Sequence, residues 1–359
     1  MKRIIILMTA LTMLISCGKN DIVPPTTTDK EAAVETPGNN SGTDTTVENH
    51  IIVGYATYWD SVLPDPTHLT HINYSFAHIK SDFESLDIKT SSRLKKIVAL
   101  KEKNPDLKVC LAVGGWGAGN FSEMAADETH RKKFVENCVK ACETYNLDGI
   151  DLDWEYPTSS SAGISSSPND TKNFNLLVAE LKEALGENRV LTMASSSSAK
   201  YVDFKTAIKY LDWVNIMSYD MGKPPQHNSG LHASSMTKRS CEEAVKFHYQ
   251  AGVPYSKMTL GMPFYGHGNE KDFKEGIYFN KIKTDGYTEK WDDKALVPYL
   301  VNASGTMVLT YDNERSIGLK ADFVKSKGLL GAMYWNIEGD DKNWTLSKAI
   351  ASRLLDKAE

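Results

Sequence analysis

Residues 148–157 read Asp-Gly-Ile-Asp-Leu-Asp-Trp-Glu-Tyr-Pro, a stretch in which Asp151, Asp153 and Glu155 recur with a period of two. In a β-strand this period places all three carboxyl groups on one face, about 6.5 Å apart along the strand. The residues between them are apolar, which is the composition of a strand buried on both sides. The alternative, a solvated acidic edge strand, fits that composition poorly.

Crowding of these acids has a consequence for their protonation. Carboxyl groups that share a partly desolvated site raise one another's pKa, so the three cannot all ionise freely. We expect at least one proton to be shared or retained near neutral pH. A carboxylic acid that is still protonated near pH 7 can act as a general acid, so the stretch predicts a catalytic acid.

From residue 51 onward, short β-rich apolar runs alternate with amphipathic helical stretches. The expected strands are Ile51–Tyr58, Thr70–Phe76, Lys108–Gly114, Gly149–Glu155, Val190–Ser195, Trp213–Tyr219, Met258–Phe264 and Leu330–Asn336. The expected helices include Ser91–Lys103, Thr129–Tyr145, Thr171–Leu185, Cys241–Ala251, Arg315–Lys327 and Leu346–Lys357. Such alternation predicts an α/β fold with parallel strands, and eight repeats in roughly 300 residues fit a closed (β/α)8 TIM barrel.

Residues 265–309 interrupt this rhythm. We expect a small insertion there, between strand seven and helix seven, that forms one wall of a cleft. A long ordered loop without a fold of its own is the alternative.

The strand ends indicate where function lies, because active sites of such barrels occupy the carboxyl ends of the strands. Aromatic side chains gather at these ends: Trp116, Trp154, Tyr219, Tyr265 and Trp335. Any one of them could simply fill the core. Their shared position instead indicates a cleft in which aromatic rings stack on the flat, apolar faces of sugars.

The first sixteen residues are typical of a signal peptide, since Lys2 and Arg3 precede an apolar run too short to span a bilayer. The sequence Leu-Ile-Ser-Cys at 14–17 resembles a bacterial lipobox, which would make Cys17 the lipidated residue after cleavage. An ordinary signal peptide with an incidental cysteine is the alternative. The rest of 17–50 is rich in Thr, Pro, Asn, Gly and acids, and we expect a disordered linker there. The catalytic barrel is then 51–359.

Composition excludes several classes of function. Cleavage before Cys17 would remove the two charges of Lys2 and Arg3 and change the formal net charge from −5 to −7. An acidic body without a basic cluster argues against nucleic-acid binding. No later apolar run reaches 18 residues, so membrane attachment is expected through the lipid only. Buried thiols are expected at the four remaining cysteines, with neither metal nor cofactor.

At this point the residues resemble a known family. Asp148, Asp151, Asp153 and Glu155 fit the acidic motif D-x-x-D-x-D-x-E of glycoside hydrolase family 18, the chitinases and their relatives. Further motifs are similar and follow in the expected order: Gly54-Tyr55 with Trp59, Asn73-Tyr74-Ser75-Phe76, Gly114-Gly115-Trp116, Met217-Ser218-Tyr219-Asp220, Gly261–Gly266, Tyr311-Asp312 and Trp335. The resemblance covers roughly residues 51–356.

The resemblance implies substrate-assisted hydrolysis with retention, an exception to the usual scheme of two carboxylates. Glu155 would protonate the glycosidic oxygen, and the substrate's own acetamido carbonyl would form an oxazolinium intermediate. Asp153 would orient the acetamido group, Asp151 would share a proton with Asp153, and Tyr219 would bind the acetamido oxygen. The resemblance also implies a set of substrate-binding residues: Tyr55, Phe76, Gly115, Trp116, Met217, Asp220, Tyr265 and Trp335.

Two departures from the family pattern put individual contacts in doubt. Ala112 stands where relatives often carry a serine, which removes a hydroxyl near the acids. His267 stands where many relatives have arginine, so the substrate contact assigned to that arginine is uncertain.

The leading hypothesis is therefore a monomeric hydrolase of β-1,4-linked N-acetylglucosamine, in chitin, chitooligosaccharides or a related glycan. Its expected location is the bacterial cell envelope, anchored by lipid to the outer membrane and facing either side of it. An endo-β-N-acetylglucosaminidase acting on the chitobiose core of N-glycans is the nearest rival. An inactive glycan-binding lectin and a cell-surface scaffold without turnover are alternatives of other classes. The presence of Glu155, Asp153 and Tyr219 in this sequence argues against the lectin.

Overall fold

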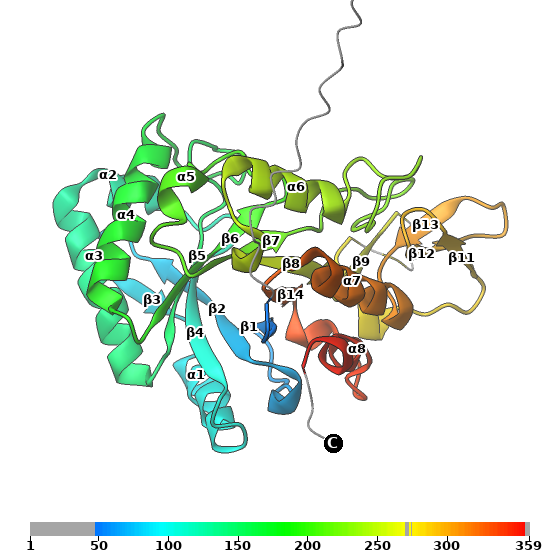
Figure 1. Ribbon diagram of the computed structural model, residues 1–359, viewed down its shortest axis with the longest axis horizontal. Helices are drawn as coiled ribbons and strands as arrows, with labels where there is room; N and C mark the ends of the chain where they lie inside the picture. The colour runs from blue at the N-terminus through cyan, green and yellow to red at the C-terminus, as the bar shows by residue number, and fades with distance from the viewer. Residues whose placement is uncertain (1–46, 270–272, 274, 356–359) are drawn as a thin grey trace, which may run out of the picture. The chain divides into compact units, whose positions relative to one another are not determined.

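The computed structural model describes residues 47–269, 273 and 275–355. The signal peptide, Cys17 and nearly all of the expected linker lie outside these residues. Eight parallel strands form the centre of the fold (Figure 1). They are β1 (Ile51–Thr57), β2 (His71–Ile79), β4 (Lys108–Gly114), β5 (Gly149–Asp153), β6 (Val190–Ser196), β7 (Trp213–Met217), β8 (Met258–Pro263) and β14 (Gly331–Trp335).

These strands close into a ring. Hydrogen-bonded neighbours follow the order β1-β14-β8-β7-β6-β5-β4-β2, and pairing of β1 with β2 completes the circle. A short strand, β3 (Leu86–Ile88), extends β2 in antiparallel sense. The predicted (β/α)8 barrel is confirmed.

Helices follow most of the barrel strands and pack against their outer face. They are α1 (Ser91–Val98), α2 (Phe121–Ala126), α3 (Glu128–Tyr145), α4 (Asp170–Leu185), α5 (Phe204–Ala207), α6 (Cys241–Ala251), α7 (Glu314–Lys327) and α8 (Thr345–Leu354). The short helices α2 and α5 were not expected from the sequence. Since each is six residues or shorter, neither gives a clear helical repeat of apolar positions.

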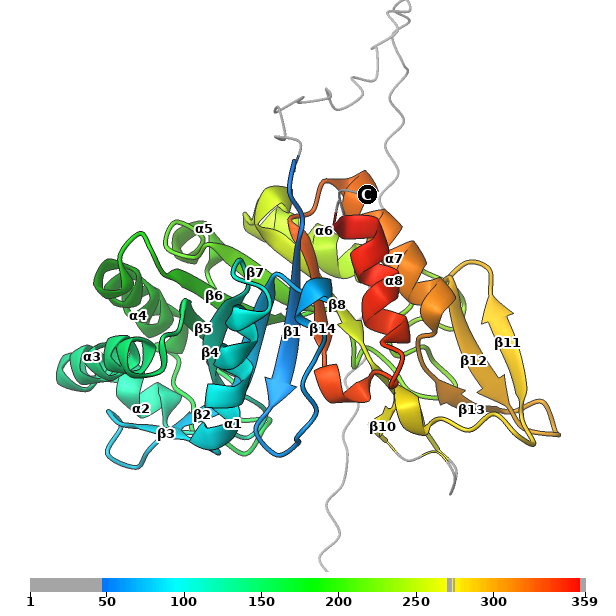
Figure 2. The ribbon, with the colours of Figure 1, turned by 90° about the horizontal axis from the view of Figure 1, so that it is seen from below.

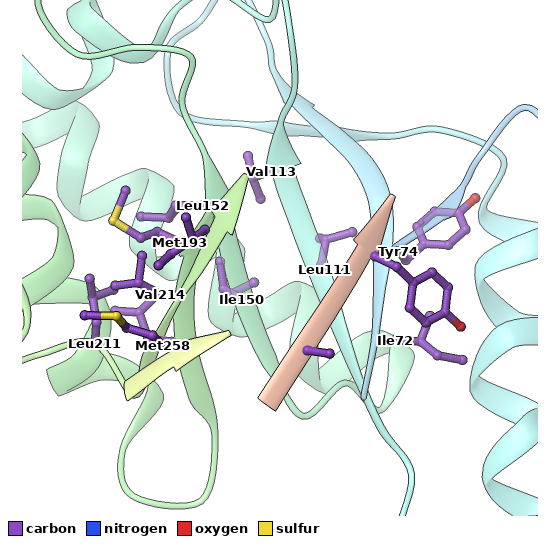
Figure 3. Packing of buried hydrophobic residues seen from close by; sticks show 14 of the residues in the cluster. Ile72, Tyr74, Leu111, Val113, Ile150, Leu152, Met193, Leu211, Val214 and Met258 are labelled. Carbon is purple, nitrogen blue, oxygen red and sulfur yellow. The ribbon is translucent and has the colours of Figure 1, made fainter. Parts of the chain in front are cut away.

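Alternation along β5 sorts its side chains between two environments. Ile150 and Leu152 are fully buried in the apolar layer between strands and helices (Figure 3). Phe134 of α3 and Leu177 of α4 belong to the same layer. The intervening acids, Asp151 and Asp153, therefore face the barrel interior. A register slip of one residue would exchange the two sets, and each buried aliphatic side chain is worth about 1.5–3 kcal/mol. The apolar residues thus fix the direction of the acids.

One part of the sequence prediction is wrong. Strand β5 ends at Asp153, so Glu155 lies beyond the strand rather than on its face. The Trp154 ring stacks on the Phe121 ring of α2, with centroids 5.2 Å apart and planes 11° apart. A hydrogen bond from the Gly115 N–H to the Asp153 carbonyl, at 2.9 Å, lies at the end of β5. The chain then bends at Glu155.

Between β8 and α7 the chain forms a five-stranded antiparallel sheet in the order β10-β9-β13-β12-β11, which Figure 2 shows beside the barrel. Its strands are β9 (Tyr265–Gly268), β10 (Ile277–Tyr278), β11 (Thr288–Asp292), β12 (Val297–Val301) and β13 (Met307–Thr310). The sheet has its own apolar cluster, which includes Phe273, Leu300, Val308 and Leu309. The insertion therefore has a fold of its own and is not merely a long loop.

The described cysteines Cys110, Cys138, Cys142 and Cys241 are buried free thiols, as predicted. Within the described residues, no group of three or more His, Cys, Asp or Glu side chains is arranged to hold a metal ion. In the same part of the chain, no helix has the length and apolar character needed to cross a membrane.

Candidate active site

A cavity of about 190 Å³ lies among the carboxyl-terminal parts of the barrel strands. Most of the residues that were predicted to bind or transform substrate form its wall. The wall consists of Tyr55, Phe76, Trp116, Asp153, Glu155, Ala194, Met217, Tyr219, Asp220 and Trp335. The predicted residues Asp151, Gly115 and Tyr265 lie behind this wall.

Asp151 is fully buried beneath the cavity, where side chains of three strands surround its carboxyl group. The Tyr55 hydroxyl donates to Oδ2 at 2.7 Å, and the Thr192 hydroxyl and Asn215 amide donate to Oδ1 at 2.5 and 3.0 Å. Burial raises the pKa of Asp151, and these hydrogen bonds oppose the rise because they favour the charged form. The arrangement stabilises a carboxylate at this depth.

Asp153 lies above Asp151 and has fewer partners. It is buried, and its Oδ1 has no hydrogen-bond partner among the described residues. Desolvation, followed by the nearby charges of Glu155 and Asp151, raises the pKa of Asp153 well above its usual value. An acid in this environment retains its proton until a new partner, such as a substrate N–H, favours the carboxylate.

Glu155 completes the row at the cavity wall. Desolvation raises the pKa of Glu155, a hydrogen bond from Tyr156 opposes the rise and the nearby charge of Asp220 adds to it, so that the pKa reaches about 7. A general acid is most effective when its pKa lies near the working pH, so Glu155 is suited to donate a proton near neutrality.

Asp220 lies three residues after the end of β7 and has a left-handed backbone conformation, with φ of 55°. Its Oδ1 accepts a hydrogen bond from the Tyr265 hydroxyl at 2.5 Å and lies 2.7 Å from His267 Nε2. Its backbone N–H donates to the Asn228 side-chain oxygen at 2.7 Å. Tyr265 therefore does not line the smaller cavity itself but holds Asp220, which does. His267 contacts the same carboxyl group.

Aromatic rings form one side of the cavity. The Trp335 and Phe76 rings are stacked, with centroids 5.7 Å apart and planes 19° apart, and Tyr55 lies 5.7 Å from Trp335. Gly115 makes room for this stack, because a Cβ atom there would approach Phe76 Cε2 to 2.7 Å. The stack offers a flat apolar surface of the kind on which a pyranose ring packs.

Tyr219 closes the opposite part of the wall. Its ring is largely buried, and its hydroxyl lies 3.7 Å from the sulfur of Met333. Burial raises the pKa of Tyr219 well above its ordinary value, so the hydroxyl keeps its proton and can donate a hydrogen bond.

A second, wider cavity of about 790 Å³ adjoins the first and shares Trp116, Glu155 and Asp220 with it. Its remaining wall includes Tyr156 and His267. Trp116 is 64% exposed at this junction, which leaves its ring free to contact a ligand. Glu155 therefore stands between two compartments, as an acid that cleaves a chain bound across both would.

Sequence reasoning did not identify Thr192, Ala194, Asn215 or Asn228. A signal for two of them exists, because Thr192 and Asn215 are polar residues with apolar neighbours on both sides in their strands. Their meeting at Asp151 depends on the register of β5 with β6 and of β6 with β7, which a single sequence does not reveal.

The closed barrel and the buried acids at its aromatic-lined mouth define the class, a glycoside hydrolase. The family model of glycosyl hydrolases family 18 matches residues 51–340. The chain therefore belongs to this family.

Individual relatives agree with this assignment. Chitinase A1 of Niallia circulans is 31% identical, and the match covers 86% of this chain and 59% of that protein. A family 18 N-acetylglucosaminidase of Paenibacillus barengoltzii superposes with a TM-score of 0.76 at 33% identity, covering 85% of this chain and all of that one (100%). A group IV chitinase of Ostrinia furnacalis, solved with allosamidin, has a TM-score of 0.75 at 26% identity over 85% of this chain and 98% of that one.

Proposed function

We propose that the protein is a retaining glycoside hydrolase that cleaves β-1,4-linked N-acetylglucosamine in chitin or chitooligosaccharides. The observation that carries the proposal is Glu155, an acid with its pKa raised to about 7 between two cavities. The similar N-acetylglucosaminidase and chitinases support the choice of sugar.

In the first step Glu155 donates its proton to the glycosidic oxygen, so that the leaving sugar departs as an alcohol. The cleaved sugar lies in the smaller cavity against the Trp335 and Phe76 stack. The leaving part of the chain extends into the wider cavity past Trp116.

The nucleophile comes from the substrate. Asp153 belongs to the same chain segment as Glu155, two residues before it, whereas a protein nucleophile must reach the opposite side of the anomeric carbon. The acetamido carbonyl is already bonded to the neighbouring carbon and has a high effective molarity. Attack by that oxygen gives an oxazolinium ring and releases the leaving sugar.

Asp153 and Tyr219 orient the acetamido group. The partner-free Oδ1 of Asp153 accepts the acetamido N–H and, once charged, balances the positive charge that develops on the ring. Asp151 shares a proton with Asp153. The three hydrogen-bond donors around Asp151 lower its pKa and so favour the proton on Asp153. The Tyr219 hydroxyl donates to the acetamido oxygen. Glu155, now a carboxylate, then removes a proton from the water that opens the oxazolinium ring with retention.

A product profile tests this proposal. The wild-type protein should cleave chitotetraose and should not cleave a chain whose reacting sugar is glucosamine without its acetyl group. A thiazoline mimic of the cyclised acetamido group should inhibit competitively. Hydrolysis of the deacetylated chain at a comparable rate, or a trapped glycosyl–Asp153 adduct, would contradict the mechanism.

The same experiment includes a high-mannose glycopeptide as a second substrate. Cleavage of its chitobiose core in preference to chitotetraose would identify an endo-β-N-acetylglucosaminidase instead. Binding of both glycans without turnover would identify a lectin.

We further propose that Cys17 carries a lipid that anchors the protein to the bacterial cell envelope. The proposal rests on the apolar run that ends at Ile15 and on the Ser16-Cys17 pair that follows it.

A further inference from the structure

A pair of stacked tyrosines lies on the outside of the barrel, away from the candidate active site. Tyr249 belongs to α6, and Tyr255 belongs to the 3-10 helix Tyr255–Lys257 that leads into β8. Their ring centroids are 4.5 Å apart and their planes are 19° apart. Tyr249 is 53% exposed. A single exposed tyrosine is unremarkable, but two parallel rings form a platform.

The platform lies in a groove of about 550 Å³. Gln250 and Lys246 of α6 line the groove beside Tyr249, and Lys327 of α7 lines it from the neighbouring helix. Positions 249 and 250 lie three and four residues after position 246, so both neighbour it on the helix surface. Aromatic rings and hydrogen-bonding groups thus face the same space.

The groove lies at the amino-terminal end of the barrel strands. The Tyr255 carbonyl accepts a hydrogen bond from the Leu330 N–H at 3.2 Å, immediately before β14 begins. β8 begins at Met258, directly after Lys257. The cavities of the candidate active site contain residues from the opposite ends of the strands, such as Trp335. The groove is therefore a separate site and not an extension of the active-site cleft.

Charges in the groove are largely compensated. The Glu242 carboxyl group lies 2.8 Å from His232 Nδ1 and 3.7 Å from Lys327 Nζ. The Glu243 carboxyl group accepts the Ser240 N–H at 2.8 Å and so caps α6. A rim of this kind favours a neutral ligand rich in hydroxyl and amide groups over an ion.

We infer that this tyrosine groove is a second glycan-binding site, which takes a neutral chain of N-acetylated amino sugars. The choice of glycan rests on the proposed function. The Tyr249–Tyr255 stack has the same interplanar angle as the Trp335–Phe76 stack in the catalytic cavity, and both offer a flat face to a sugar ring.

A protein partner or a membrane surface fits the groove less well. Either would need a contiguous apolar patch around the exposed ring. Among the described residues, the other exposed large apolar side chains are Trp59, Val62, Leu63, Trp116 and Leu176, and the groove includes none of them. Binding at the groove would hold an insoluble chain near the enzyme without occupying the cleft.

Three variants test the inference: Tyr249→Ala, Tyr249→Phe and, as a matched control, Leu176→Ala, which removes an exposed apolar side chain from α4. Each is also made with Glu155→Gln, so that adsorption to insoluble chitin is measured without cleavage. Tyr249→Ala should weaken adsorption about three- to tenfold, the range for loss of one aromatic stacking contact. Tyr249→Phe and Leu176→Ala should adsorb like the parent protein.

With Glu155 intact, Tyr249→Ala should degrade insoluble chitin several-fold more slowly at low chitin concentration and should cleave soluble chitotetraose at the unchanged rate. Equal adsorption of Tyr249→Ala and its parent would overturn the inference, as would equal losses in Leu176→Ala or Tyr249→Phe. If the parent protein cleaves no chitotetraose, the proposed function fails, while the adsorption comparison still decides whether the groove binds glycan.

Discussion

Glu155 combines two properties: burial raises its pKa to about 7, and its side chain lines both cavities. Substitution Glu155→Gln keeps the size of the side chain and removes the transferable proton. We expect turnover of chitotetraose to fall by about 10²–10⁴ while binding is largely retained. Rates near those of the wild type would remove Glu155 from this role.

The same acid sets the pH dependence of the wild type. Because Glu155 must be protonated in the free enzyme, kcat/KM should decline as pH rises through about 7. This alkaline limb should be absent from any residual activity of Glu155→Gln.

Burial of Glu155 also has a cost in stability. Folding raises the pKa of this carboxyl from 4.5 to about 7, so the folded state favours the protonated form. The contribution of Glu155 to the free energy of unfolding is therefore fully present below pH 4.5. It is lost as the pH rises through about 7, and the loss is at most about 3 kcal/mol. Glu155→Gln should therefore unfold at a higher denaturant concentration than the wild type at pH 8, with a much smaller difference at pH 5. A gap that widens at pH 5 would contradict this assignment.

The carboxyl group of Asp151 accepts hydrogen bonds from side chains of three other strands, while Ala112 beside it offers no hydroxyl. Thr192→Val removes the hydroxyl at 2.5 Å and leaves a side chain of the same shape, so the pKa of Asp151 should rise further. We expect turnover to fall about 10- to 150-fold, which corresponds to the loss of one hydrogen bond to a charged group.

Ala112→Ser is the matched control for this prediction, because Ala112 pairs with Asp151 across β4 and β5. Asp151 already accepts three hydrogen bonds, so the added hydroxyl should change turnover less than about threefold. A tenfold gain in Ala112→Ser would mean that the donors present do not compensate for the absent serine.

At the scale of elements, the segment after β7 is attached to the inserted sheet through Asn228. Its side-chain oxygen accepts the Asp220 N–H at 2.7 Å, and its own N–H donates to the Thr310 hydroxyl of β13 at 2.9 Å. Asn228→Ala should release Asp220 from its left-handed conformation and lower kcat/KM on chitotetraose about 3- to 30-fold. Thr310→Val acts on the same segment, so the double variant should lose less than the product of the two single losses. Independent, multiplicative losses would show that Asn228 does not connect the two elements.

Element boundaries show what a single sequence reveals. The period of two in residues 149–153 correctly predicts that Asp151 and Asp153 face inward, because the alternating Ile150 and Leu152 must be buried against the helices. The same period continues through Glu155, although the strand does not. The strand ends at Asp153, and Trp154 just beyond it packs against Phe121, a residue more than thirty positions away whose location no local pattern encodes.

At the scale of the whole molecule, alternation of strand and helix predicts the barrel, since parallel strands with right-handed crossovers allow few other arrangements. The surroundings of Asp151, in contrast, cannot be predicted from strand and helix alternation. Thr192 and Asn215 meet it only because three strands align in one register, and register is a property of the closed sheet. The tyrosine groove likewise depends on the packing of α6 beside the 3-10 helix before β8.

The expected membrane anchor belongs to the same scale. The linker joins the barrel at Ile51, the amino-terminal end of β1, whereas the catalytic cavity lies among the carboxyl-terminal parts of the strands. A lipid on Cys17 would therefore keep the enzyme near a membrane while attachment stays at the end of the barrel opposite the cavity.

Cys17→Ala removes the lipidation site, and we expect it to move the protein from the membrane fraction to the soluble fraction of the producing bacterium. Its rate on chitotetraose should equal that of the wild type, because Cys17 is not among the residues that line the two cavities. Quantification of the protein in both fractions, together with that rate, measures the two effects separately. A variant that stays in the membrane fraction would show that something other than Cys17 holds it there.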